Sequence, residues 1–370
     1  MRLPTFQELS KEQDVILNLP LDGNFLVSGP PGTGKTVMAL YRAHALNADG
    51  RPARLLMHGN VLSQYTRLAA KALGIEAAVA TFHSWFGSLW RSTYGSAVPT
   101  VGHGDPWAFD WPAIRATFTS EPPRRDSLED VLVDEGQDLS VDFYRIVRRL
   151  ARNISVFADE NQKLFEDNST LDEIERNLGA NVEHHQLTRN YRNTQEIALL
   201  AREFYCGVQT GVPDLPEDRR GDTPVLRRFP RMYEFVDYVV RYATTWSDQT
   251  IGIACPNKTA QKHLLNRLGN KGLPHAPLAY MSDEPKHHDL DFESPGIKIV
   301  HYRSVKGLEF DAVFAPELQQ IVKDPTSAEL KMTMYVVASR ARRVLEFSYT
   351  GDGPEPGIVA GIPAHLLERR

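Results

Sequence analysis

The sequence predicts an α/β protein of two domains, each a parallel β-sheet with helices on both faces. Three observations lead to this expectation. The chain has 370 residues, which is enough for about two domains. Short apolar runs that read as buried strands alternate with helix-like stretches in both halves of the chain. A glycine-rich stretch, Gly29–Thr36, lies between the first apolar run and the first long helix, which is the strand, loop and helix order of a βα unit.

The first half of the chain is expected to contain five strands. A short helix should begin after Ser10, a plausible N-cap. The run at 131–134 is apolar enough for a strand buried on both faces. Residues 95–123, rich in proline and glycine, are read as a small insertion with one short helix after Pro112. The strands are expected at 25–27, 53–57, 77–82, 131–134 and 154–158, and two long helices at 37–47 and 61–73.

The second half repeats this alternation without repeating the sequence. The domain boundary is expected near residues 180–190, which gives domains 1–185 and 186–370. The expected strands are 225–229, 251–254, 297–300, 312–314 and 344–349, and the expected helices are 194–205, 233–245, 260–268 and 328–342.

Composition narrows the class of protein. Hydrophobic residues make up 42% of the chain, so a normal core is available. The formal net charge of −5 lowers the expected non-specific affinity for nucleic acid, although a local groove can still be positive. Cys206 and Cys255 match no metal-ligand spacing and fit a reduced compartment. No apolar run approaches the length of a membrane span, so we expect a cytoplasmic protein without a membrane partner.

The glycine-rich stretch has the residues of a phosphate-binding loop. Its glycines let successive backbone N–H groups point at phosphate oxygens, and the following helix N-terminus adds positive potential. A lysine in this register reaches the β- and γ-phosphates, and the next hydroxyl is a Mg²⁺ ligand. We therefore expect ATP and Mg²⁺ to bind here. The residues are Gly29, Pro30, Pro31, Gly32, Thr33, Gly34, Lys35 and Thr36.

An acidic segment, Asp134–Asp138, ends the fourth expected strand. In-line hydrolysis needs a carboxylate for the metal and a second one for the attacking water. Asp134 is the candidate metal ligand and Glu135 the candidate base. On its own, a strand followed by an acidic turn is an ordinary structural feature.

Other polar residues follow later strands. Gln162, after the fifth strand, is a candidate for sensing the γ-phosphate, although the segment by itself also reads as an ordinary polar loop. Arg192 and Arg340, the latter on an expected helix, are candidates for stabilising transition-state charge from a second domain. Either arginine alone also reads as a surface charge or a structural ion pair. Glu309 lies in a turn that could contact ribose or a water near the γ-phosphate.

In combination, these segments resemble superfamily 1 helicases of the UvrD/Rep type. The likeness runs through nearly the whole chain and implies two RecA-like domains with a nucleotide cleft between them. The matching segments, in order, are Gln13, Gly29–Thr36, Thr81–Ser84, Asp134–Asp138, Gln162, Asn190–Arg192, Lys306–Phe310 and Tyr335–Ala341.

The resemblance assigns roles to these positions. It implies that Gln13 reads the adenine, that Tyr191 stacks on the base and that Arg192 contacts the γ-phosphate. Lys35, Glu135, Gln162, Arg192 and Arg340 are the implied catalytic residues, and Glu309 is an implied nucleotide contact. The implied contacts to single-stranded DNA are Thr81, Phe82, His83, Phe165 and Arg303.

The sequence also departs from that family. Only about 45 residues separate Trp90 from Asp134, and about 45 separate Pro256 from His301, too few for a full accessory domain of ~50 residues. Asp167 falls where the family has a tryptophan, and Arg303 replaces a DNA-contacting histidine. These changes bear on unwinding more than on ATP hydrolysis.

Two functions remain open at this point. The first is an ATP hydrolase that acts as a single-stranded-DNA translocase or helicase, with 3′ to 5′ movement implied by the resemblance. The second is a nucleotide-gated switch or regulatory subunit of a protein partner such as a nuclease. A P-loop kinase is a poor third, because it gives Arg192, Arg340 and the acidic segment no natural role.

Overall fold

The computed structural model describes residues 3–57, 60–102, 108–122, 129–159, 169–207, 211–216, 219–281, 291–292 and 294–370. These residues form two compact units. The first unit comprises Arg2–Gly29 and Gly34–Leu187, and the second comprises Thr188–Arg370 together with Pro30–Thr33. Each unit has its own parallel sheet, so the predicted fold class is confirmed. Among the described helices, none is both long and apolar enough to cross a membrane.

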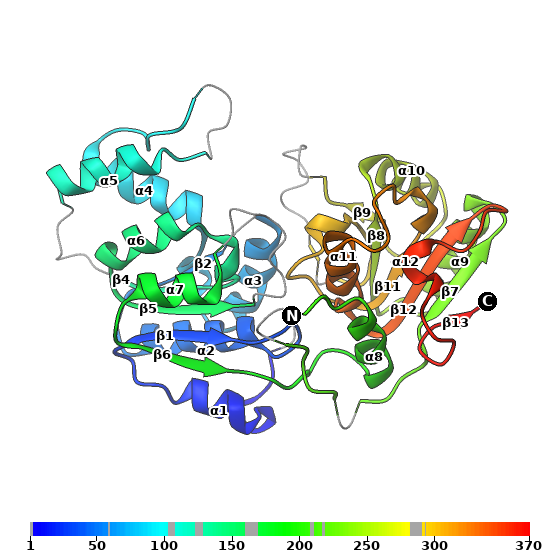
Figure 1. Ribbon diagram of the computed structural model, residues 1–370, viewed down its shortest axis with the longest axis horizontal. Helices are drawn as coiled ribbons and strands as arrows, with labels where there is room; N and C mark the ends of the chain where they lie inside the picture. The colour runs from blue at the N-terminus through cyan, green and yellow to red at the C-terminus, as the bar shows by residue number, and fades with distance from the viewer. Residues whose placement is uncertain are drawn as a thin grey trace. The chain divides into compact units, whose positions relative to one another are not determined.

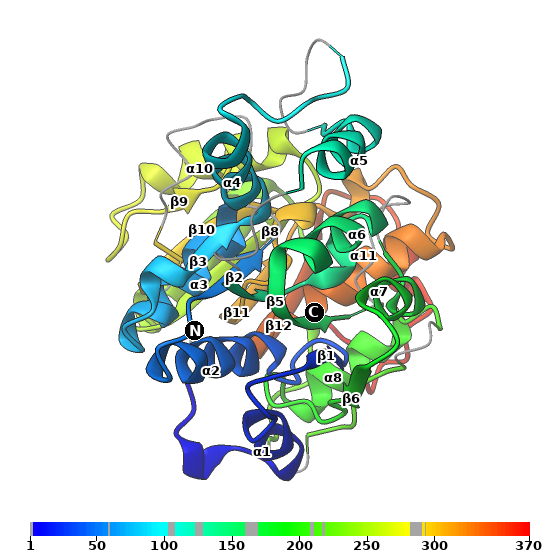
Figure 2. The ribbon, with the colours of Figure 1, turned by 90° about the vertical axis from the view of Figure 1, so that its left-hand side faces the viewer.

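The first unit has a six-stranded sheet in the order β3-β2-β4-β5-β1-β6, and every pairing in it is parallel. Figures 1 and 2 show helices on both of its faces. The strands are β1 (Asn24–Ser28), β2 (Ala53–Met57), β3 (Val79–Thr81), β4 (Glu129–Val133), β5 (Ala151–Ala158) and β6 (Val182–Gln186). The helices are α1 (Lys11–Leu17), α2 (Lys35–Ala48), α3 (Asn60–Ala72), α4 (Phe82–Tyr94), α5 (Trp111–Ser120), α6 (Val141–Leu150) and α7 (Leu171–Leu178), with short 3₁₀ turns η1 (Phe6–Glu8), η2 (Glu76–Ala78) and η4 (Gly136–Asp138).

One face of this sheet packs against α4, α5, α6 and α7. Alternate strand residues such as Leu26, Val131 and Val156 join one hydrophobic cluster with these helices. The cluster is rich in aromatic rings, including Phe86 and Trp90, so the aromatic face of α4 forms part of the core.

The second unit has a seven-stranded sheet in the order β13-β7-β12-β11-β8-β10-β9. Helices α9 and α10 pack on one face, and α8 and α11 on the other (Figure 1). Its strands are β7 (Val225–Phe229), β8 (Thr250–Cys255), β9 (Leu278–Ala279), β10 (Gly296–His301), β11 (Phe310–Ala315), β12 (Ala341–Thr350) and β13 (Glu368–Arg369). Its helices are α8 (Gln195–Glu203), α9 (Met232–Thr245), α10 (Lys258–Gly269), α11 (Ala328–Ala338) and α12 (Gly357–Ala360), with 3₁₀ turns η7 (Tyr302–Ser304) and η8 (Leu318–Gln320).

Helix starts in both units follow the capping rule. A side-chain oxygen at the N-cap accepts a backbone N–H of the first turn, which satisfies one of the donors that a helix leaves unpaired. The residues that cap in this way include Ser10, Thr81, Asp110, Ser140, Thr170, Thr194, Asn257 and Ser327.

Three expectations about the elements were wrong. The helix expected at 328–342 ends at Ala338, because the chain turns there and Ala341 pairs with Phe310 as the start of β12. Arg340 therefore lies in a turn and not on a helix. Phe82 opens α4 instead of ending β3, because the Thr81 side chain caps that helix. β6 was not foreseen, since its polar residues show no alternation and only pairing with β1 holds it in the sheet.

Candidate nucleotide site

The phosphate loop connects β1 to α2 in the first unit's sheet. Gly32 and Gly34 have φ values of +87° and +90°, a region that residues with a Cβ rarely adopt. Gly34 is the N-cap of α2, and no side chain caps this helix, so backbone donors of its first turn are not taken by a cap. A Cβ at Gly34 would lie 2.5 Å from Gln13 Nε2, so the Gln13 amide packs directly on the loop.

The lysine of the loop is buried and already paired. Lys35 is 6% exposed, and its Nζ donates a hydrogen bond of 2.5 Å to the Gly29 carbonyl. The same Nζ lies 3.6 Å from a carboxylate oxygen of Asp159, which is fully buried after the end of β5. Sequence reasoning missed Asp159. The available signal was its place at the end of the strand that pairs with β1, because parallel strands bring their carboxyl ends to one edge.

Asp134 has the chemistry of a cation ligand. It follows β4, is 1% exposed, and neither of its carboxylate oxygens has a hydrogen-bond partner among the described residues. Burial and the neighbouring Glu135 raise its pKa to about 7, against the lowering effect of the Thr36 hydroxyl and Lys35. A buried carboxylate with free oxygens beside a hydroxyl suits Mg²⁺, which takes one or two carboxylates and substrate phosphates as ligands. Asp134 and Thr36 therefore fit the metal that the sequence implies.

Glu135 is held in a strained backbone conformation. Its φ of 53° lies in the left-handed region, which is uncommon for a residue other than glycine. The next residue must be glycine, because a Cβ at Gly136 would lie 2.4 Å from Val156 Cγ1. The backbone therefore fixes the direction in which the Glu135 side chain leaves the end of β4.

Gln137 connects Glu135 to the lysine. It is fully buried, its Nε2 donates to Glu135 Oε2 at 2.6 Å, and its Oε1 accepts the Asp159 N–H at 2.9 Å. Because Asp159 also pairs with Lys35, one chain of contacts joins the candidate base to the phosphate loop. Sequence reasoning missed Gln137, which differs from an ordinary turn residue only in its buried contacts.

We expect Gln137→Met to slow ATP hydrolysis and to shift its pH profile. The amide donates to the Glu135 carboxylate and so favours the ionised base. Without that donor, protonation of Glu135 becomes easier and the acid limb of the rate profile moves to higher pH. Hydrolysis rates measured from about pH 5.5 to about pH 8 test this, because a rate that depends on an ionised base and a protonated acid has a bell-shaped pH profile. An unshifted acid limb would show that Gln137 only packs.

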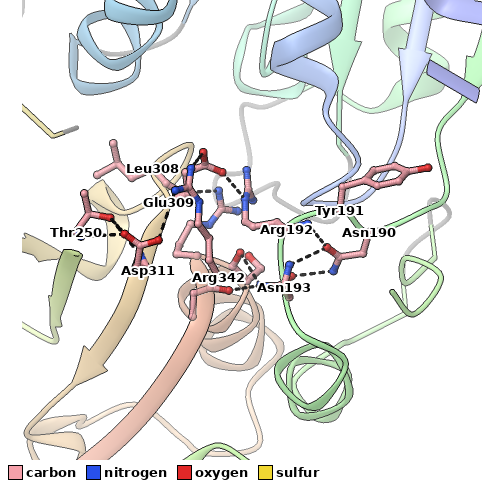
Figure 3. A network of polar contacts seen from close by, with 12 residues as sticks. Asn190, Tyr191, Arg192, Asn193, Thr250, Leu308, Glu309, Asp311 and Arg342 are labelled. Atoms are coloured by element: carbon pink, nitrogen blue, oxygen red, sulfur yellow. Dashed lines mark hydrogen bonds and ion pairs between the residues drawn. The ribbon is translucent and has the colours of Figure 1, made fainter. Parts of the chain in front are cut away.

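The second unit contains a network around the predicted arginine (Figure 3). Asn190 accepts the Arg192 N–H at 2.9 Å and donates to Asn193 at 2.8 Å. Asn193 in turn donates to the carbonyls of Ser339 at 3.2 Å and Ala341 at 2.6 Å. The segment that carries Arg192 is thus fastened to the turn between α11 and β12.

The Arg192 guanidinium is oriented by Glu309. Its Nε donates to Glu309 Oε2 at 3.0 Å, while its Nη1 is buried without a hydrogen-bond partner among the described residues. Arg342 binds the other oxygen of Glu309 and also lies 3.7 Å from Asp311 (Figure 3). Although burial alone would raise it, Arg192 and Arg342 lower the pKa of Glu309 to about 2, so this carboxylate stays ionised at neutral pH. Glu309 thus orients the two arginines, and its contact with nucleotide stays a prediction.

The two remaining second-unit candidates are placed differently. Arg340 is 1% exposed and donates to the backbone carbonyls of Val336 at 3.0 Å and Leu308 at 3.5 Å. These two bonds use Nε and Nη1 and so fix the plane of the guanidinium group. Tyr191 is half-buried, and the Arg189 guanidinium lies 6.0 Å from its ring centre.

The predicted nucleic-acid contacts divide into buried and accessible residues. Phe82 is 4% exposed and packs its ring against Phe86, Phe109 and Phe143. Arg303 is exposed and lies 3.7 Å from Glu329. Thr81 caps α4 through its side chain, and His83 is half-buried beside it. Gln162 and Phe165 lie outside the described residues.

We expect Phe82→Ala to lower the unfolding free energy by about 3–5 kcal/mol, the usual cost of removing a buried aromatic ring. Urea denaturation of the variant measures this. His83→Ala is the matched neighbour, and we expect it to leave stability almost unchanged while weakening single-stranded-DNA binding. Equal stability of the Phe82→Ala and His83→Ala proteins would contradict the core assignment of Phe82.

A family comparison agrees with the class of the first unit. Residues 14–166 match the family model described as an AAA domain, which is less than half of the chain. The first unit is therefore a P-loop nucleotide-binding domain, and the phosphate loop, Asp134 and Asp159 lie within the match. Comparison with curated proteins finds no match to this sequence.

A solved structure supports the fold. A Saccharomyces cerevisiae Dbp5 variant, solved with Nup159, a Gle1 variant, IP6 and ADP, superposes with a TM-score of 0.51 at 14% identity, over 98% of this chain and 91% of that one. This similarity supports the RecA-like form of the two domains. The C-terminal domain of a possible DNA helicase from Lactobacillus plantarum WCFS1 has a TM-score of 0.36 at 24% identity, over 48% of this chain and 98% of that one. An arterivirus nonstructural protein 10 (helicase) in complex with DNA has a TM-score of 0.40 at 14% identity, over 94% of this chain and 64% of that one.

Proposed function

We propose that the protein is an ATP hydrolase driven by nucleic acid, a single-stranded-DNA translocase or helicase of the UvrD/Rep type. The observation that most supports ATP hydrolysis is the difference between two adjacent carboxylates, those of Asp134 and Glu135. Among the described residues, no hydrogen bond of ordinary geometry reaches either carboxylate oxygen of Asp134, whereas Glu135 is held by backbone strain and by Gln137. A protein that only binds nucleotide has no need of a second, separately oriented carboxylate.

Different residues of the chain have different roles in hydrolysis. Backbone N–H groups of the phosphate loop and the Lys35 ammonium hold the β- and γ-phosphates. Glu135 accepts the proton of the attacking water and orients it. Asp134 and Thr36 would hold Mg²⁺, which neutralises phosphate charge when bound. Gln13 is proposed to contact the adenine, since its amide already packs on the loop.

We propose that the second unit supplies transition-state stabilisation through Arg192. Its buried Nη1, which has no hydrogen-bond partner in the described part of the chain, is a donor that would bind a phosphate oxygen, and leaving it unpaired costs free energy. Tyr191 is proposed to stack on the base, and Arg340 is proposed as a second arginine that stabilises the transition state. The proposed domain limits are 1–185 and 186–370.

Nucleic-acid dependence is proposed from the resemblance and from the accessible residues His83 and Arg303. Steady-state ATP hydrolysis, measured with and without oligo(dT) at low and moderate salt, tests it. We expect strong stimulation that weakens as salt rises, because phosphate contacts release counterions. A rate that is indifferent to both DNA and RNA would overturn the proposal and favour a nucleotide-gated switch for a protein partner.

A further inference from the structure

A groove lined by five arginines lies in the first unit, and none of its lining residues has been assigned a role above. Its volume is about 820 Å³. Helices α5, α6 and α7 form it, and Figures 1 and 2 both show α6 between the other two. The arginines are Arg115, Arg145, Arg148, Arg149 and Arg176, and no carboxylate is among the lining residues.

The charge of this groove is largely uncompensated. Asp142 pairs with both Arg115 and Arg145, the latter at 3.2 Å. Arg148, Arg149 and Arg176 are exposed and form no ion pair with any described residue. On a chain with a net charge of −5, this is a concentrated positive patch.

Helix dipoles explain only part of the pattern. Arg148 and Arg149 lie in the last turn of α6 and Arg176 in the last turn of α7, where the helix dipole favours positive charge. That effect requires no particular direction around the helix. It does not explain why arginines from three helices line one groove.

The groove lies at the opposite edge of the sheet from the phosphate loop. Arg148 and Arg149 come just before Ala151, where β5 begins, whereas Asp159 follows the other end of that strand. β5 has eight residues, so the two edges are roughly 26 Å apart at ~3.3 Å per residue. An anion in the groove is therefore a different ligand from the nucleotide phosphates.

We propose that this groove binds the phosphate backbone of duplex nucleic acid. Guanidinium groups match phosphate geometry with paired donors. Phe118, the aromatic residue of the lining, is only 5% exposed, so unpaired bases find no stacking platform. Ile146 is 4% exposed, which leaves a protein partner without an apolar anchor. A duplex, which presents phosphates and hides its bases, fits this lining best.

The inference goes beyond the proposed function, because it concerns a second nucleic-acid surface that does not contact ATP. Such a surface would hold the duplex that flanks a single strand.

The test compares two double variants of the full chain by fluorescence anisotropy with a short blunt-ended duplex. Arg148→Gln/Arg149→Gln removes two groove charges. Arg241→Gln/Arg267→Gln removes two exposed charges from α9 and α10 of the second unit and is the matched control. We expect the groove variant to bind at least ~10-fold more weakly at ~0.1 M salt and its slope of log K against log salt to fall by about 2. Arg176→Gln is a milder variant that should lower the slope by about 1.

Equal duplex affinity of the groove variants and the control would overturn the inference. Polyglutamate and unlabelled duplex are also compared as competitors, with both concentrations expressed as negative charge. If polyglutamate displaces the labelled duplex at the lower concentration, the inference is overturned and the groove is a site for an acidic protein segment. Stimulation of hydrolysis by single-stranded DNA, measured on the same proteins, decides the proposed function separately. Its absence in the unsubstituted protein would leave the comparison of duplex affinities unaffected.

Discussion

Glu135→Gln is expected to slow ATP hydrolysis by about 10²–10⁴-fold, the usual contribution of a positioned general base. Glutamine keeps the size of the side chain but cannot accept the proton of the attacking water. The strained backbone at φ 53° and the Gly136 contact should persist, because neither depends on the carboxylate. ATP affinity should therefore change by less than about threefold, since Glu135 acts on water and not on the bound nucleotide.

Glu129→Gln is the matched control for this experiment. Glu129 begins the same strand, β4, and pairs with Arg54 at 3.0 Å, far from the phosphate loop along that strand. Its hydrolysis rate should equal that of the unsubstituted protein. Turnover that persists in Glu135→Gln would show that another group activates the water.

Arg192→Ala is expected to lower the hydrolysis rate at saturating ATP by about 10³-fold or more, the range measured for arginines that stabilise phosphoryl-transfer transition states. Arg192→Lys should not restore it. A lysine has one charged nitrogen, whereas the arginine uses Nε for Glu309 and keeps Nη1 without a partner. The loss should appear in the maximal rate and not in ATP affinity, because the interaction strengthens in the transition state.

Arg342→Ala tests whether Arg192 acts in catalysis or only supports the structure of the network around Glu309. It removes the other arginine that binds Glu309 but leaves the Arg192 guanidinium and its Nη1 in place. We expect a loss of stability with at most a ~10-fold drop in rate. A rate in Arg192→Ala no lower than in Arg342→Ala would contradict a phosphate-binding role for Arg192.

The sequence predicted those parts of the fold that local patterns determine. The bounds of β2 and β7 match the expected ranges, and the phosphate loop lies between β1 and α2 as its glycines and lysine required. β6 was not predicted, because four of its five residues are polar. Its place at the edge of the sheet depends on pairing with β1. The end of α11 was missed because its last residues are all buried, so periodicity does not mark where the helix stops.

The sequence predicted candidate residues for the site but not the contacts between their side chains. Motif spacing identified Lys35, Asp134 and Glu135, since each follows or precedes a strand at the same edge of the sheet. The contacts that orient them come from Gln137 and Asp159, which meet only after β4 and β5 pair. Arg340 shows the reverse case, because its motif suggests an available side chain and the structure gives it backbone partners.

The time that the protein takes to reach the end of a single-stranded DNA tests directly whether it translocates. A fluorophore at the 5′ end of oligonucleotides of increasing length reports when the protein reaches that end after ATP is added. We expect a delay between ATP addition and the signal that grows linearly with oligonucleotide length and disappears in Glu135→Gln. A signal whose timing is independent of length, in a protein that still hydrolyses ATP, would contradict translocation and leave the nucleotide-gated switch.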